Sequence, residues 1–135
     1  MSDFESDIEL RTDHYFKLTK SVVNKHGDVD VTYAIFMRRP VIYCSKLAIE
    51  WINLVINYRG GSIDIKECFE EGAWVGAGEV LMYLSGRLTH LADLETIFLQ
   101  KLGGPCVAAY NAFAMTSDLA NVAFIAMDAR HCAGT

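Results

Sequence analysis

The chain ends in an apolar run that limits its possible folds more than any other stretch. Residues 121–131, NVAFIAMDARH, are apolar at almost every position before Asp128. A strand with one face in water alternates apolar and polar residues, whereas a strand covered on both faces is apolar throughout. We therefore predict a buried strand over 121–129, typical of a parallel sheet or barrel. Such a strand needs parallel partners, which we expect in further sequence or in another chain.

The first half of the chain predicts two helices after a leader. Residues 1–11 are polar and acidic, and we expect them to be mobile. Apolar residues recur at helical spacing over 12–25, and Gly27 stands where that helix would stop. A second helix is predicted over 44–58, with Ser45 as its N-cap.

Strands are predicted before and after the second helix, and further helices are predicted in the last third of the chain. Alternating apolar residues indicate a strand within 28–40, and glycine-punctuated runs over 62–86 indicate short strands joined by tight turns. The apolar stripe of 87–102 predicts a helix that ends at the Gly-Gly-Pro of 103–105. An alanine-rich helix is then expected over 106–119.

Composition describes one globular domain. The 135 residues carry a net charge of -5, with 52% hydrophobic and 21% charged residues. Nucleic acid is not an expected partner, because phosphate binding needs a basic stripe and Arg38–Arg39 is the only adjacent basic pair. The polar N-terminus resembles no signal peptide, and no apolar stretch reaches the roughly 20 residues of a membrane span. We expect a soluble, cytoplasmic protein with reduced thiols.

The cysteines and histidines give no support to a metal site. They are widely spaced and form no C-x-x-C pair, so zinc is not predicted and structural thiols are expected instead. These residues are Cys44, Cys68, Cys106, Cys132, His14, His26, His90 and His131.

Polar residues that follow the buried terminal strand are candidates for a binding site. Arg130 and His131 come directly after it, and loops at the strand ends of a parallel barrel converge on active sites. A guanidinium binds a carboxylate or phosphate through two hydrogen bonds. An exposed pair with no ligand is the alternative.

Three other features of the sequence are candidate sites. Tyr15, at the start of a predicted helix, says little by itself. Glu95 lies in an apolar helical face, where a carboxylate needs a partner, and a structural pair with Arg87 or His90 is favoured over a catalytic acid. The stretch 71–86 is similar to a biotinyl or lipoyl carrier hairpin, but it lacks the lysine that would hold the cofactor.

Taken together, four segments resemble the N-terminal part of nicotinate phosphoribosyltransferase. The most specific is Gly-x-Leu-x-x-x-x-x-x-Glu-Thr, from Gly86 to Thr96. The segments, in order, are TDHYF at 12–16, DVTYAIFMRRP at 30–40, EGAWVGAGEVLMYLSGRLTHLADLETIFLQKLG at 71–103, and DARHCAG at 128–134.

The resemblance implies a fold and an activity. The fold would be α+β: an N-terminal α/β sandwich domain of a type II phosphoribosyltransferase over 1–120, with the first strand of a truncated α/β barrel over 121–135. Members of the family, which are glycosyltransferases or ligases of pyridine nucleotide and NAD biosynthesis, make nicotinate mononucleotide and pyrophosphate from nicotinate and phosphoribosyl pyrophosphate. They usually couple this to ATP hydrolysis and use magnesium, whose binding residues are not expected in this chain.

The resemblance also implies which residues bind substrate. Two subunits would form a head-to-tail homodimer with shared sites, in which Tyr15 stacks on the nicotinate ring of the neighbour's site. Arg130 would hold nicotinate carboxylate or phosphoribosyl groups, and His131 stands where many members have a second arginine. No catalytic residue is assigned, and because a full barrel needs about 250 residues, the chain alone is expected to be inactive. The alternative is a stand-alone module that binds a small acid or a protein.

Overall fold

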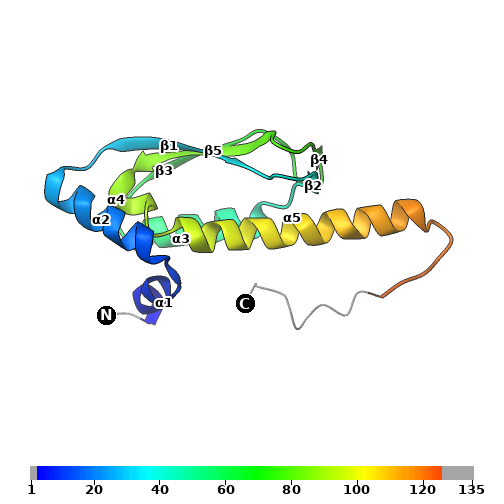
Figure 1. The fold of residues 1–135 in the computed structure, drawn as a ribbon, viewed down its shortest axis with the longest axis horizontal. Helices are drawn as coiled ribbons and strands as arrows, with labels where there is room; N and C mark the ends of the chain where they lie inside the picture. Colours follow the sequence, from blue (N-terminus) through cyan, green and yellow to red (C-terminus); the bar gives the residue numbers. More distant parts are fainter. Residues whose placement is uncertain (1–2, 126–135) are drawn as a thin grey trace.

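Residues 3–125 are described by a computed structural model, and Figure 1 shows how their helices and strands are arranged. The prediction of an α+β fold is confirmed. The elements, in chain order, are α1 (Asp3–Arg11), α2 (His14–His26), β1 (Asp30–Phe36), β2 (Val41–Ile42), α3 (Lys46–Tyr58), β3 (Ile63–Glu67), β4 (Trp74–Val75), β5 (Val80–Arg87), α4 (Leu88–Leu91) and α5 (Glu95–Asp118).

A three-stranded antiparallel sheet forms one layer. Its order is β1-β5-β3, with Asp30 opposite Arg87 and Ile35 opposite Met82. β2 and β4 pair separately, as a two-residue antiparallel ladder. Side chains alternate along β1, so that Ile35 is buried while its neighbours Ala34 and Phe36 are exposed.

Two helices, α3 and α5, cover one face of this sheet (Figure 1). The buried residues of α3 share one side of the helix, as its apolar periodicity predicted: Ala48, Ile52, Val55 and Ile56. They pack with Leu81, Met82 and Leu84 of β5 and with Phe98 and Leu102 of α5 in a single core. The predicted helices at 12–25 and 44–58 are therefore confirmed as α2 and α3.

The expected mobile leader is wrong, because residues 3–11 form α1. Ile8 is almost fully buried in the core, and the Thr12 hydroxyl donates to its carbonyl at 2.6 Å. One buried apolar side chain and its neighbours hold a segment whose composition is otherwise polar.

The predicted helix end at 103–105 is also wrong. α5 continues through Gly103, Gly104 and Pro105 to Asp118 as one helix. Glycine and proline lower helix propensity, but packing outweighs this here: Cys106 is buried, and a methyl group on Gly103 would lie 3.4 Å from Met37. The start differs as well, because α4 and a short turn precede α5, where one helix over 87–102 was expected.

The structure describes residues 121–125 of the predicted buried strand at 121–129, and these residues do not form a strand. Residues 121–125 form a turn and an irregular segment, and they are exposed. A strand needs a neighbour for its backbone hydrogen bonds, and within 3–125 no strand pairs with them. The remainder of that prediction lies beyond the described residues, and the domain boundary at 120 stays a prediction.

Candidate functional site

Tyr15 lies at the start of α2 with its ring in solvent. The Asp13 carboxylate accepts a hydrogen bond from the Tyr15 backbone N–H at 3.0 Å and so caps the helix. The side chain is 68% exposed, and its only ring neighbour among the described residues is Phe16, edge-on at 5.4 Å. The Asp13 backbone N–H also donates to the Thr96 hydroxyl at 3.4 Å. This bond places the starts of α2 and α5 side by side. An exposed ring held on a capped helix is available to an external planar ligand.

An apolar stripe continues from Tyr15 along α2. Leu18 and Val22 follow at helical spacing, and both are more than half exposed. Tyr15, Leu18 and Val22 thus present apolar side chains to solvent along one side of α2.

Arg130 and His131, the other two predicted site residues, lie outside the described residues. Their distance from Tyr15 is therefore not defined, and their assignment stays a prediction.

Sequence reasoning missed the principal ionic cluster, which surrounds Arg59 at the end of α3. Its guanidinium donates to Asp93 at 2.8 and 3.0 Å and to Glu5 at 2.9 and 3.0 Å. Lys20 adds a bond to Asp93 at 2.6 Å. This cluster joins α1, α2, α3 and the turn before α5. No local sequence pattern announces it, because its members are far apart in the chain.

The charges in this cluster stabilise one another. Burial opposes ionisation of Asp93, but the hydrogen bonds from Arg59 and Lys20 outweigh it and lower the pKa of Asp93. The bond from Arg59 likewise lowers the pKa of Glu5. Burial alone would lower the pKa of Arg59, yet the two carboxylates raise it.

The predicted pair of Glu95 with Arg87 or His90 is wrong. Arg87 binds Asp28 at 2.9 Å, and no ion pair of Glu95 occurs within residues 3–125. Burial raises the pKa of Glu95. The buried, paired carboxylate of this segment is Asp93, two residues earlier.

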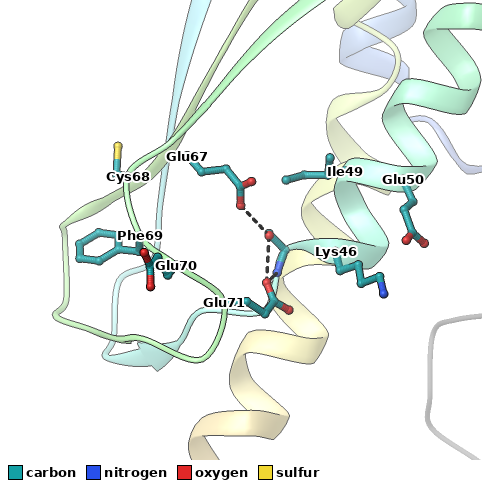
Figure 2. A pocket seen from close by; sticks show the side chains of 9 residues that line it. Lys46, Ile49, Glu50, Glu67, Cys68, Phe69, Glu70 and Glu71 are labelled. Atoms are coloured by element: carbon teal, nitrogen blue, oxygen red, sulfur yellow. Dashed lines mark hydrogen bonds between the residues drawn. The ribbon is translucent and has the colours of Figure 1, made fainter.

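A hollow of about 670 Å³ lies at the other end of α3, and Figure 2 shows the side chains that line it. The Ser45 hydroxyl is 2.8 Å from a Glu67 carboxylate oxygen and 3.1 Å from one of Glu71, which also accepts the Ser45 backbone N–H at 2.9 Å. The Tyr43 hydroxyl donates to Glu67 at 2.7 Å. Ser45 stands at the predicted N-cap position, but its side chain makes no capping bond and turns to these glutamates.

The charge of this hollow decides which ligands it can take. Four glutamates and one lysine line it, namely Glu50, Glu67, Glu70, Glu71 and Lys46. Carboxylate and phosphate ligands are repelled by such a wall, so the hollow does not suit a pyridine carboxylate. Nor do residues 3–125 contain any group of three or more His, Cys, Asp or Glu side chains placed to hold a metal ion.

The three described cysteines are free thiols. Cys106 is buried, its sulfur accepts the Cys44 backbone N–H at 3.3 Å, and burial raises its pKa to about 11. Its environment is that of a structural thiol, whereas Cys68 is exposed. Among the helices of residues 3–125, none is long and apolar enough to cross a membrane.

The comparisons with known proteins identify the domain. Residues 13–106 match the family described as quinolinate phosphoribosyl transferase, N-terminal domain. No curated protein matches the chain.

Two solved structures share its fold. The nicotinate-nucleotide pyrophosphorylase of Francisella tularensis superposes with a TM-score of 0.53 at 20% identity, over 73% of this chain and 33% of its own. The enzyme of the same name from Pyrococcus furiosus gives 0.59 at 19% identity, over 76% of this chain and 26% of its own. The chain thus spans about a third or less of these neighbours.

The family match concerns an N-terminal domain, and the two solved structures match over part of their own length. The fold is that of the N-terminal domain of a type II phosphoribosyltransferase, and the family match covers most of the chain, including the capped start of α2 and all three strands of the sheet. The chain belongs to the family of quinolinate phosphoribosyl transferase N-terminal domains.

Proposed function

We propose that this chain is the N-terminal domain of an enzyme that transfers a phosphoribosyl group from phosphoribosyl pyrophosphate to nicotinate, releasing pyrophosphate, in the salvage of NAD. The match of residues 13–106 to the quinolinate phosphoribosyl transferase family carries this proposal. The choice of nicotinate rests on the family motifs of the sequence, above all the stretch from Gly86 to Thr96.

In this proposal the chain supplies residues to a substrate site. The exposed ring of Tyr15 stacks on the flat pyridine ring, and Arg130 and His131 bind the carboxylate or phosphoribosyl groups. Transfer of the ribosyl group passes through a cationic centre, so that positioning and electrostatic stabilisation are the main tasks of the enzyme.

The remaining components come from outside this domain. A homodimer with shared sites would bring Tyr15 to the neighbour's barrel, and the apolar stripe on α2 is a surface for that contact. ATP and magnesium enter by resemblance alone. Because residues 3–125 hold no cluster for a metal ion, no step is assigned to these residues through either group.

An assay of the protein encoded by the complete reading frame tests the activity. It is incubated with phosphoribosyl pyrophosphate and, separately, nicotinate, quinolinate or nicotinamide. We expect nicotinate mononucleotide and pyrophosphate from nicotinate. Turnover of quinolinate alone would replace nicotinate as the substrate, and no turnover with any acid would overturn the proposal. The 135-residue chain alone should form no product.

Two variants of the same protein test the site. Removing the ring with Tyr15→Ala should raise the KM for nicotinate about tenfold, the effect of losing roughly 1.4 kcal/mol of stacking. Tyr15→Phe keeps the ring and is the matched control. Arg130→Ala should lower kcat/KM, and Arg130→Lys should restore it only in part, because lysine lacks the planar fork. Unchanged kinetics in both alanine variants would remove these residues from the site.

A further inference from the structure

The start of α2 is held mainly by hydrogen bonds. Val23 is the only buried residue of α2 (His14–His26), and it follows Tyr15 by eight positions, about 12 Å along the helix axis. Phe16 is half-buried, and its ring meets that of Tyr15 edge-on. A helix whose only buried side chain lies near its end needs other contacts to fix the direction of its first turn.

Asp93 supplies two of these contacts. The hydroxyl oxygen of the buried Thr12 lies 2.7 Å from the Asp93 carbonyl oxygen and 2.6 Å from that of Ile8, so that one hydrogen is shared between two acceptors. The Lys20 ammonium donates to the Asp93 carboxylate at 2.6 Å. Two hydrogen bonds from Arg59 of α3 hold the same carboxylate, and Asp93 is therefore a fixed point of the core.

The two contacts reach Asp93 from different turns of α2. Thr12 precedes the N-cap residue Asp13, whereas Lys20 follows about two turns later. Because a helical side chain tilts toward the N-terminus of its helix, Lys20 reaches back toward the residue that Thr12 binds. Two contacts from separate turns fix the direction of the helix axis, which a single contact would leave free to pivot.

Tyr15 projects from another side of α2. A helix turns by about 100° per residue, so Tyr15 and Lys20 are about 140° apart around the axis. The Tyr15 ring is largely exposed, whereas Lys20 is directed at Asp93. The contacts with Asp93 therefore hold α2 from one side and leave the ring open to a ligand on another.

We propose that Thr12, Lys20 and Asp93 are positioning residues, which fix the direction in which α2 presents the Tyr15 ring to a pyridine carboxylate. This role rests on the proposed function, in which that ring stacks on the substrate. None of the three needs to touch the ligand, because a ring already held in the binding orientation loses less freedom when the substrate arrives. Loss of either contact should therefore weaken substrate binding more than it slows the transfer step.

Steady-state kinetics of the protein encoded by the complete reading frame test this role. Thr12→Val removes the hydroxyl at similar volume and should raise the KM about threefold, with little change in kcat. The KM is that for nicotinate, or for quinolinate if quinolinate is the acid turned over. Thr12→Ser keeps a hydroxyl and should have the KM of the wild type. Thr32→Val removes an exposed hydroxyl from β1; it is the matched control and should change neither constant.

Lys20→Met tests the second contact. It should raise the KM about twofold, and it decides the matter if Thr12→Val, at a buried position, shows no folded state in a thermal melt. Its control is Lys25→Met, which removes an exposed lysine of the same helix that forms no ion pair within residues 3–125. The KM of this control should equal that of the wild type.

A double-mutant cycle separates positioning from a general loss of stability. In a Tyr15→Ala background no ring remains to be placed, so Thr12→Val and Lys20→Met should no longer raise the KM. A rise that persists without the ring, or an unchanged KM in both single variants, overturns the positioning role and leaves the proposed function in place. A wild-type protein that turns over neither acid overturns the proposed function, and the positioning role falls with it.

Discussion

The two ends of α3 carry charged clusters that are built in opposite ways. At the C-terminal end, Arg59 lies between Glu5 and Asp93, and Lys20 completes a balanced group of two cations and two carboxylates. At the N-terminal end, glutamates outnumber the single lysine around an open hollow.

Both ends agree with the helix dipole, which favours carboxylates at its start and cations at its end. The two ends of α3 differ in whether opposite charges balance the carboxylates. The balanced end joins four segments and is structural, whereas the acidic end keeps uncompensated charge at the surface and repels anions. The acidic end is therefore a poor place for an anionic substrate, whereas Lys20 of α2 binds Asp93 in the balanced cluster.

The largest effect should come from opening the balanced cluster. Arg59→Met leaves Asp93 and Glu5 without their main cation, and the buried carboxylate should cost about 3 kcal/mol of unfolding free energy. Urea denaturation measures the loss. Arg87→Met is the control, because the Arg87 side chain is 52% exposed in its pair with Asp28 and its removal should cost much less. Equal losses of unfolding free energy in the two variants would contradict the view that burial makes the Arg59 cluster more stabilising than the exposed Arg87 pair.

A steric change beside the same cluster should come next. A Cβ on Gly61 would overlap the imidazole of His90, whose backbone carbonyl accepts from Arg59 at 3.3 Å. Gly61→Ala should cost about 2 kcal/mol through overpacking, read from thermal unfolding. In a His90→Ala background the same substitution should cost little. A cost that persists without the imidazole would point to the backbone of Gly61 instead.

These long-range contacts also explain where sequence reasoning succeeded and failed. α2, α3 and β1 followed from local periodicity, because their apolar residues recur along one face. α1 and the full length of α5 did not, since Ile8 and Cys106 are held by residues distant in sequence. Tyr15 could be placed at a helix start from its neighbours. Arg59 and Asp93, 34 positions apart, could be paired only by the folded chain.

Acid should weaken the Arg59 end. The pKa values of Asp93 and Glu5 are lowered in the folded chain from 3.8 and 4.5, so their stabilisation is complete above those unfolded values and is lost as pH falls through the lowered ones. Unfolding free energy should therefore decrease on acidification below about pH 4.5. The slope should be smaller in Arg59→Met but not zero, because the pKa of Asp28 is also lowered, to about 2, mainly by Thr89. An unchanged slope would show that Arg59 does not hold these carboxylates.

The smallest effects belong to the acidic end, where single changes act on hydrogen bonds near solvent. Ser45 has one hydroxyl hydrogen for two carboxylates, and Ser45→Ala should cost about 1 kcal/mol. Glu67→Gln keeps an acceptor for Tyr43 and removes one of two neighbouring negative charges, so that its cost should stay below about 0.5 kcal/mol or turn into a gain. Thermal unfolding at low and high salt measures both, since screening reduces the repulsion that the glutamine removes. A loss from Glu67→Gln as large as that from Arg59→Met would mean that the two ends are equally structural and that the acidity of the hollow is fully compensated.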